Sequence, residues 1–97
     1  MQLNIFSFFS GAGFLDLGFE KENYNIVFVN EFNASFLEVY KYSREQMNMK
    51  TPKYGYFCGD INKLQRGNCK KIFSSNVNNA KSLGLVGFIG GPPSPDF

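Results

Sequence analysis

The chain has 97 residues, of which 43% are hydrophobic and 18% aromatic, so it is too apolar for a disordered tail and long enough for one domain at most. Its net charge of +2 does not by itself indicate a polyanionic partner, although nine of its ten basic residues fall between residues 41 and 81, with only two acids among them. No apolar run approaches the roughly 18 residues that a membrane span needs, and the first residues lack the basic region and cleavage site of a signal peptide, so we expect a cytoplasmic protein. Two cysteines without any histidine cannot build a zinc site, so we expect no metal.

The first predicted element is an apolar strand over Leu3–Phe9, followed by the glycine turn Ser10–Gly13. A short helix is predicted from Phe14. Helical spacing places Asp16 and Glu20 on its polar side, away from the apolar residues. The pattern therefore reads as strand, tight turn and helix.

A second strand is predicted over Ile26–Val29, followed directly by Asn30 and Glu31. A longer amphipathic helix then begins near Asn33, whose side chain is suited to cap it. Its predicted apolar face consists of Phe36, Leu37, Tyr40 and Met47.

The second half of the chain holds two further strands, over Tyr54–Cys58 and Leu85–Ile89. Between them we expect one or two short helices within Ile61–Ser75 and a loop at Asn76–Asn79. The fourth strand leads into the loop Gly90–Pro95, in which two glycines and two prolines precede a serine.

Strands that alternate with helices predict a parallel sheet with right-handed crossovers. The glycine turn, Glu31, Asp60 and the Gly-Gly-Pro-Pro loop each follow a predicted strand directly. Because open α/β folds bind ligands at the carboxyl edge of the sheet, we expect one crevice to collect all four features.

The glycine turn followed by an acid about 20 residues later is typical of a nucleoside-binding half-fold, with Glu31 accepting from the ribose hydroxyls. The third glycine of a dinucleotide fingerprint is missing, since the next glycine after Gly13 is Gly18 and the bulky Phe14 stands at the helix start. No basic residue adjoins the turn, which favours a nucleoside without phosphates such as S-adenosylmethionine. Asp60 could then accept from the adenine amino group, with Ile61 and Phe32 as apolar walls. Taken alone, Asp60 is more often a turn residue or a helix cap.

At this point the chain resembles the DNA (cytosine-5) methyltransferases, on four motifs in family order. The motifs are Phe9-Ser10-Gly11-Ala12-Gly13 with Leu17-Gly18-Phe19-Glu20, then Asn30-Glu31, Gly59-Asp60-Ile61 and Gly90-Gly91-Pro92-Pro93. The resemblance implies an α/β, Rossmann-like, S-adenosylmethionine-dependent methyltransferase fold, with a parallel sheet and flanking helices. Residues 1–97 would form the N-terminal part of its cofactor-binding catalytic domain, without a target-recognition domain.

The resemblance also implies roles for individual residues. The cofactor S-adenosylmethionine would contact Phe9, Gly11, Ala12, Gly13, Glu31, Phe32, Asp60, Ile61 and Pro93. The nucleophilic cysteine of the family, which adds to C6 of a flipped-out cytosine in double-stranded DNA, corresponds to Ser94. A serine hydroxyl is a weak nucleophile without a neighbouring base, so we expect the chain to be inactive by itself. A second departure is Ser7, where family members usually have an acid.

Several alternatives stay open. An exocyclic amino methyltransferase would need a side-chain acceptor where Gly91 stands, and a nicotinamide or flavin enzyme is opposed by Phe14 and the proline loop. A non-catalytic role is the third alternative, either as a cofactor-binding fragment or as one subunit of a split methyltransferase whose second polypeptide carries the remaining motifs. The basic segment 41–81 could contact DNA phosphates or could be an ordinary solvated surface.

Overall fold

The computed structural model describes residues 3–8 and 14–90, and for Phe14 and Leu15 the backbone only. Strands and helices alternate along the described chain, as the sequence predicts. Their order is β1 (Leu3–Phe8), α1 (Phe14–Lys21), β2 (Asn25–Glu31), α2 (Ala34–Gln46), β3 (Tyr56–Cys58), the 3-10 helix η1 (Ile61–Gln65), α3 (Gly67–Leu83) and β4 (Leu85–Gly90). None of the described helices is long and apolar enough to cross a membrane.

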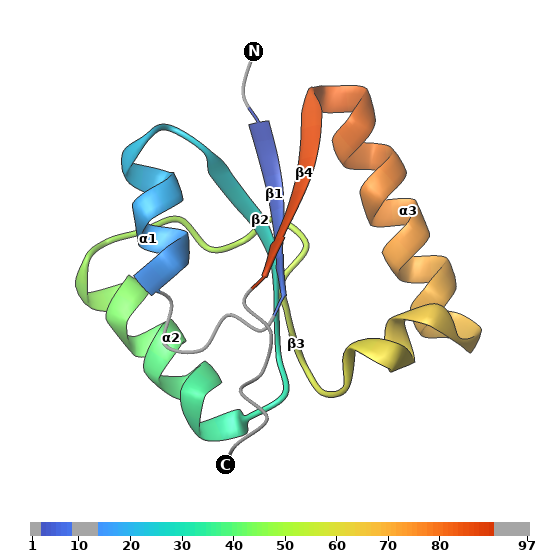
Figure 1. The fold of residues 1–97 in the computed structure, drawn as a ribbon, viewed down its shortest axis with the longest axis horizontal. Helices are drawn as coiled ribbons and strands as arrows, with labels where there is room; N and C mark the ends of the chain where they lie inside the picture. The colour runs from blue at the N-terminus through green and yellow to red at the C-terminus, as the bar shows by residue number, and fades with distance from the viewer. Residues whose placement is uncertain (1–2, 9–13, 91–97) are drawn as a thin grey trace.

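Among the described residues the strands form one parallel sheet in the order β3-β2-β1-β4. Helices α1 and α2 cover one face of this sheet, and α3 covers the other (Figure 1). This layering confirms the predicted α/β fold with a parallel sheet and flanking helices.

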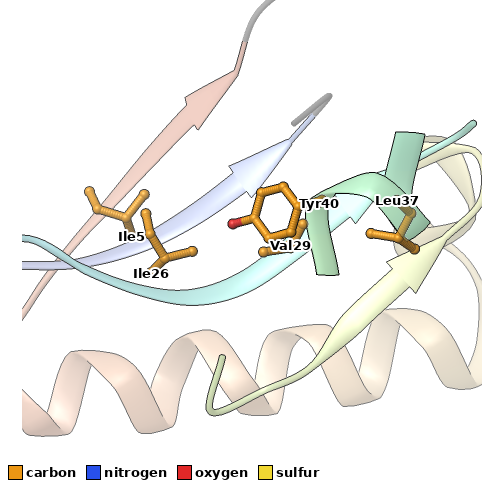
Figure 2. Close-up of a cluster of buried hydrophobic side chains, with 5 residues drawn as sticks. All are labelled: Ile5, Ile26, Val29, Leu37 and Tyr40. Carbon is orange, nitrogen blue, oxygen red and sulfur yellow. The ribbon is translucent and has the colours of Figure 1, made fainter. Parts of the chain in front are cut away.

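The core is divided between the two faces of the sheet because side chains alternate along each strand. On the α1 and α2 face, the buried residues are Ile5, Ile26, Val29, Leu37 and Tyr40 (Figure 2). On the α3 face, they are Phe6, Val27, Phe28, Leu64 and Ala80. Two successive residues of β2, Val27 and Phe28, belong to the second cluster because the β1–β2 register shifts between Ile5 and Phe6.

Helix α2 begins as predicted, because the Asn33 side chain accepts a hydrogen bond from the Phe36 backbone N–H at 3.1 Å. Its predicted apolar face is only partly correct. Leu37 and Tyr40 are buried, whereas Phe36 is 52% and Met47 46% exposed, since Phe36 lies in the first turn and Met47 caps the end of the helix.

The predicted loop at Asn76–Asn79 is wrong, because α3 runs through it without a break. Phe73, Val77 and Ala80 recur at helical spacing and pack against the α3 face of the sheet. Asparagine is only a moderately poor helix former, and the burial of this apolar stripe outweighs its low propensity. The asparagine-rich composition of this segment is therefore the polar side of a helix.

Candidate functional site

The carboxyl ends of all the described strands lie at one edge of the sheet, at the bottom in Figure 1. Phe8, near the end of β1, is paired with Asn30 of β2 and with Gly90 of β4, and Glu31 is paired with Cys58 of β3. Among the described residues, this edge carries Glu31 at the end of β2 and the connection from β3 to Asp60, at the edge where open α/β sheets bind ligands.

The ends of β2 and β3 are joined by the side chain of Asn30, which is fully buried. Its Nδ2 donates to the carbonyl oxygens of Phe57 at 3.1 Å and Gly59 at 3.0 Å. The Gly59 backbone N–H donates in turn to the Glu31 carbonyl oxygen at 3.2 Å. We call these three hydrogen bonds the Asn30 clamp. The clamp fixes the connection that carries Glu31 against the one that carries Asp60.

Glu31 and Phe32 stand together at the end of β2 but differ in exposure. Glu31 is 7% exposed, and its Oε2 accepts from the Asn33 backbone N–H at 2.7 Å. The Phe32 ring is 67% exposed, and its carbonyl oxygen lies 3.9 Å from the Cys58 Sγ. The structure thus places a backbone-bonded carboxylate next to an exposed aromatic residue, and their roles as ribose acceptor and apolar wall stay predictions.

Asp60 is exposed and its Oδ1 accepts from the Asn62 backbone N–H at 2.9 Å, which caps η1. The helix-cap role named above is therefore present in the structure. A carboxylate offers about four acceptor positions, so capping leaves capacity for a ligand. Ile61 follows and packs, partly buried, against the cluster around Phe6.

An open hollow of about 630 Å³ lies beside these residues, between the ends of β1 and β4 and the elements η1 and α3. Most of its lining is apolar or aromatic, and it is formed by Phe8, Ile61, Leu64, Gln65, Lys70, Phe73, Ser74 and Phe88. Its volume is within the usual range of small-molecule sites, about 300–1,000 Å³. Of the predicted site residues that the structure describes, Ile61 lines this hollow.

Family comparison agrees with this geometry, because residues 3–97 match the model of C-5 cytosine-specific DNA methylases. The chain belongs to this family. It is 56% identical over 94 residues to the type II methyltransferase M.NmeDI of Neisseria meningitidis serogroup C, a match that covers 96% of this chain and 22% of that protein. It is 33% identical over 91 residues to M.NgoPII of Neisseria gonorrhoeae, covering 94% and 21% respectively.

The chain thus spans about a fifth of the length of these methyltransferase relatives. A shorter match, of 31 residues at 64% identity, joins it to M.MthTI of Methanothermobacter thermautotrophicus. No solved structure gives a significant match to the chain.

The site residues predicted for this C-5 cytosine methylase chain divide into two groups. The structure brings the first group, Glu31, Phe32, Asp60 and Ile61, to neighbouring strand ends. The second group lies outside the described residues and consists of Phe9, Gly11, Ala12, Gly13, Pro93 and Ser94. For both groups the roles inferred from the sequence stay predictions.

Sequence reasoning missed a buried polar network, and its placement of Asp16 on an outward side of α1 is wrong. Asp16 is 1% exposed. Its Oδ1 accepts from the Ser7 hydroxyl at 2.7 Å, and its Oδ2 accepts from the Tyr40 hydroxyl at 2.6 Å. The carboxylate turns inward because two buried hydroxyl groups, one from β1 and one from α2, supply the hydrogen bonds that water would otherwise make.

The protonation of this network is shifted by its surroundings. Burial raises the pKa of Asp16, and the hydrogen bonds from Tyr40 and Ser7 only partly oppose that effect. Burial also raises the pKa of Tyr40, which the neighbouring Asp16 charge raises further, so the phenol is a firm donor at neutral pH.

A buried ion pair continues the network. Arg44 of α2 binds Glu20 of α1 with both ends of its guanidinium, at 2.5 Å from Nη1 to Oε1 and 2.9 Å from Nη2 to Oε2. Its Nη2 also donates to the Lys50 carbonyl oxygen at 2.7 Å. The pair fixes α1 against the end of α2. Glu20, like Asp16, was placed on the polar side of the helix by sequence, and only the approach of Arg44 shows its role.

Proposed function

We propose that this chain supplies the S-adenosylmethionine-binding part of a DNA (cytosine-5) methyltransferase. In this proposal residues 1–97 are the N-terminal part of the catalytic domain, and the complete enzyme acts on a cytosine flipped out of double-stranded DNA. The observation that carries the proposal is the Asn30 clamp, which holds the Glu31 and Asp60 connections side by side at the carboxyl edge of the sheet. Family membership supplies the reaction class.

The residues at this edge fit an adenosyl group. Glu31, oriented by the Asn33 N–H, is suited to accept hydrogen bonds from the ribose hydroxyls. The exposed ring of Phe32 offers a face for the adenine. Asp60 would accept from the adenine amino group, and Ile61 would form an apolar wall that continues into the hollow beside it. When bound, S-adenosylmethionine supplies the methyl group.

The remaining predicted residues complete the proposal through the family resemblance. Phe9, Gly11, Ala12 and Gly13 would line the cofactor pocket from the first motif, and Pro93 would close it near the methyl group. Ser94 takes the place of the nucleophilic cysteine. Because an unactivated hydroxyl is a far weaker nucleophile than a thiolate, we expect Ser94 to prevent efficient methyl transfer.

Ser94 also favours a second candidate function. A chain that binds the cofactor without supplying a competent nucleophile could act as the non-catalytic part of an assembly with a second polypeptide. The two candidates share the same cofactor site and differ only in whether restoration of the nucleophile restores the chemistry.

The cofactor site is tested by calorimetric titration of the chain with S-adenosylmethionine and, separately, with NAD. We expect saturable binding of the former only. Glu31→Gln and Asp60→Asn should each raise the Kd by about 10- to 100-fold, because each replaces a charged acceptor by a neutral amide and puts an NH₂ donor in place of one acceptor oxygen. Glu38→Gln, on the exposed side of α2, is the matched control and should leave the Kd unchanged. Equal affinity in all three variants would refute the assignment of the site.

The role of Ser94 is tested in the complete enzyme by Ser94→Cys, measured as the transfer of labelled methyl groups to DNA. We expect the rate to rise by more than about 100-fold, because the thiolate restores the activated nucleophile. A rate that does not change, with cofactor binding intact, would favour the non-catalytic candidate.

A further inference from the structure

The buried carboxylate of Asp16 joins three elements of the fold. Each of its oxygens accepts one short hydrogen bond, from Ser7 of β1 and from Tyr40 of α2, and all three residues are 1% exposed. A buried carboxylate is costly to desolvate, and an apolar residue would pack against the sheet at a lower cost. The polar arrangement therefore calls for an explanation beyond packing.

The positions of Ser7 and Asp16 in the chain provide such an explanation. Ser7 directly precedes the last residue of β1, and Asp16 lies in the first turn of α1. Their hydrogen bond therefore spans the connection that contains Gly11 and Gly13, and it fixes the point where the chain leaves the sheet against the point where it enters the helix. A carboxylate in the first turn is also favoured by the helix dipole.

Tyr40 links Asp16 to the part of the chain that carries Glu31. It belongs to α2, the helix that begins directly after Glu31, Phe32 and Asn33. The ion pair between Arg44 and Glu20, one turn further along α2, holds the same two helices together. The hydrogen bonds of the Asp16 carboxylate thus connect the two ends of the glycine turn to α2, the helix that follows Glu31.

The side chain of Ser7 is chemically suited to its place beside Asp16. A carboxylate accepts hydrogen bonds but cannot donate one when ionised, whereas the Ser7 hydroxyl donates to Asp16. The hydroxyl at position 7 and the carboxylate at position 16 are therefore complementary in this chain.

We infer that Asp16, together with Ser7 and Tyr40, is a positioning group that holds the two ends of the glycine turn at a fixed place relative to Glu31. None of the three residues is proposed to touch the ligand. The consequence for ligand affinity rests on the proposed cofactor function, whereas the effect on the turn does not.

The effect on the turn is tested by amide hydrogen exchange without ligand. Ser7→Ala and Tyr40→Phe each remove one hydroxyl, and Ser75→Ala and Tyr42→Phe remove the same groups from exposed positions on α3 and α2. In the first two variants, peptides covering residues 7–17 should exchange about tenfold faster, the factor for one lost buried hydrogen bond, while peptides from α3 are unchanged. Unchanged exchange in residues 7–17, or the same acceleration throughout the chain, would overturn the inference.

The effect on the ligand is tested by titrating the same four variants with S-adenosylmethionine at a temperature where all are folded. Ser7→Ala and Tyr40→Phe should raise the Kd about tenfold relative to the wild-type chain, and the two exposed variants should bind like the wild type. Affinities within about twofold of the wild type in all four would overturn the positioning role. If the wild-type chain itself does not bind, the proposed function fails, and the exchange experiment still decides the inference.

Discussion

Removal of the Asn30 amide should weaken the attachment of the β3 end to the β2 end while leaving Glu31 and Asp60 in the chain. In Asn30→Ala, the carbonyl oxygens of Phe57 and Gly59 lose the Nδ2 donor, which lies 3.1 and 3.0 Å from them. Both bonds are at least partly buried, and Asn30 itself is 0% exposed, so water cannot replace the donor without a local rearrangement.

The expected loss of stability follows from these two hydrogen bonds. Each buried hydrogen bond that loses one partner costs about 1–2 kcal/mol, which gives a fall of about 2–4 kcal/mol in the free energy of unfolding. That loss is a large part of the stability of about 5–15 kcal/mol that is typical of a domain. With a urea slope of about 1–2 kcal/mol/M, the midpoint of unfolding should move down by about 1–3 M.

Urea unfolding of the wild type, Asn30→Ala and Asn78→Ala measures the effect, because Asn78 is an exposed asparagine on α3. The control should lie within about 0.5 kcal/mol of the wild type, as surface substitutions usually do. An Asn30→Ala variant as stable as the control would show that the clamp does not hold β2 to β3, and the reasoning about the site would fail with it.

Asn30→Asp separates hydrogen bonding from side-chain volume. The new carboxylate has nearly the same size but, when ionised, faces two carbonyl oxygens without a proton to donate. Its protonated form can donate to one of them, so its pKa should be raised in the folded state. The variant should therefore be least stable at neutral pH and recover relative to Asn30→Ala as the pH falls. A constant difference between the two variants across pH would contradict this explanation.

Two further predictions concern the buried network. Glu20→Gln leaves the buried Arg44 guanidinium without its counter-charge and should lower the free energy of unfolding, measured in urea, by about 3–5 kcal/mol. Glu38→Gln breaks the exposed 3.8 Å pair with Lys41 and should lower it by less than about 1 kcal/mol. Similar losses in the two variants would refute the view that the Arg44 pair is structurally important. For Asp16, burial raises the folded-state pKa above the ordinary 3.8, so the carboxyl's stabilising contribution is fully present below that pH and is lost as the pH rises through the folded pKa. The wild type should therefore gain stability relative to Asp16→Asn as the pH falls from 7 toward 4, and a pH-independent difference in urea unfolding would count against the shift.

The sequence alone determined the layered α/β fold and the edge at which the site lies. Apolar strands that alternate with helices leave a parallel sheet as the simplest arrangement, and chain connectivity then brings every strand end to the same side. Glu31 and Asp60 could be placed together because each lies within two residues of the end of a predicted strand. The order of strands and helices and the residues at their ends can be predicted from local spacing, because they depend only on residues that are close in sequence.

Only the tertiary structure decided which polar side chains face inward. The partners of Asp16 are 9 and 24 residues away, and the Asn30 side chain donates to carbonyls 27 and 29 residues away. No periodicity within a single helix or strand encodes such contacts. The same limit explains the helix through Asn76–Asn79, where burial of Val77 and Ala80 against the sheet outweighs the local preference for a turn. The inward-facing polar residues could therefore be identified only from the packing of elements that are distant in sequence.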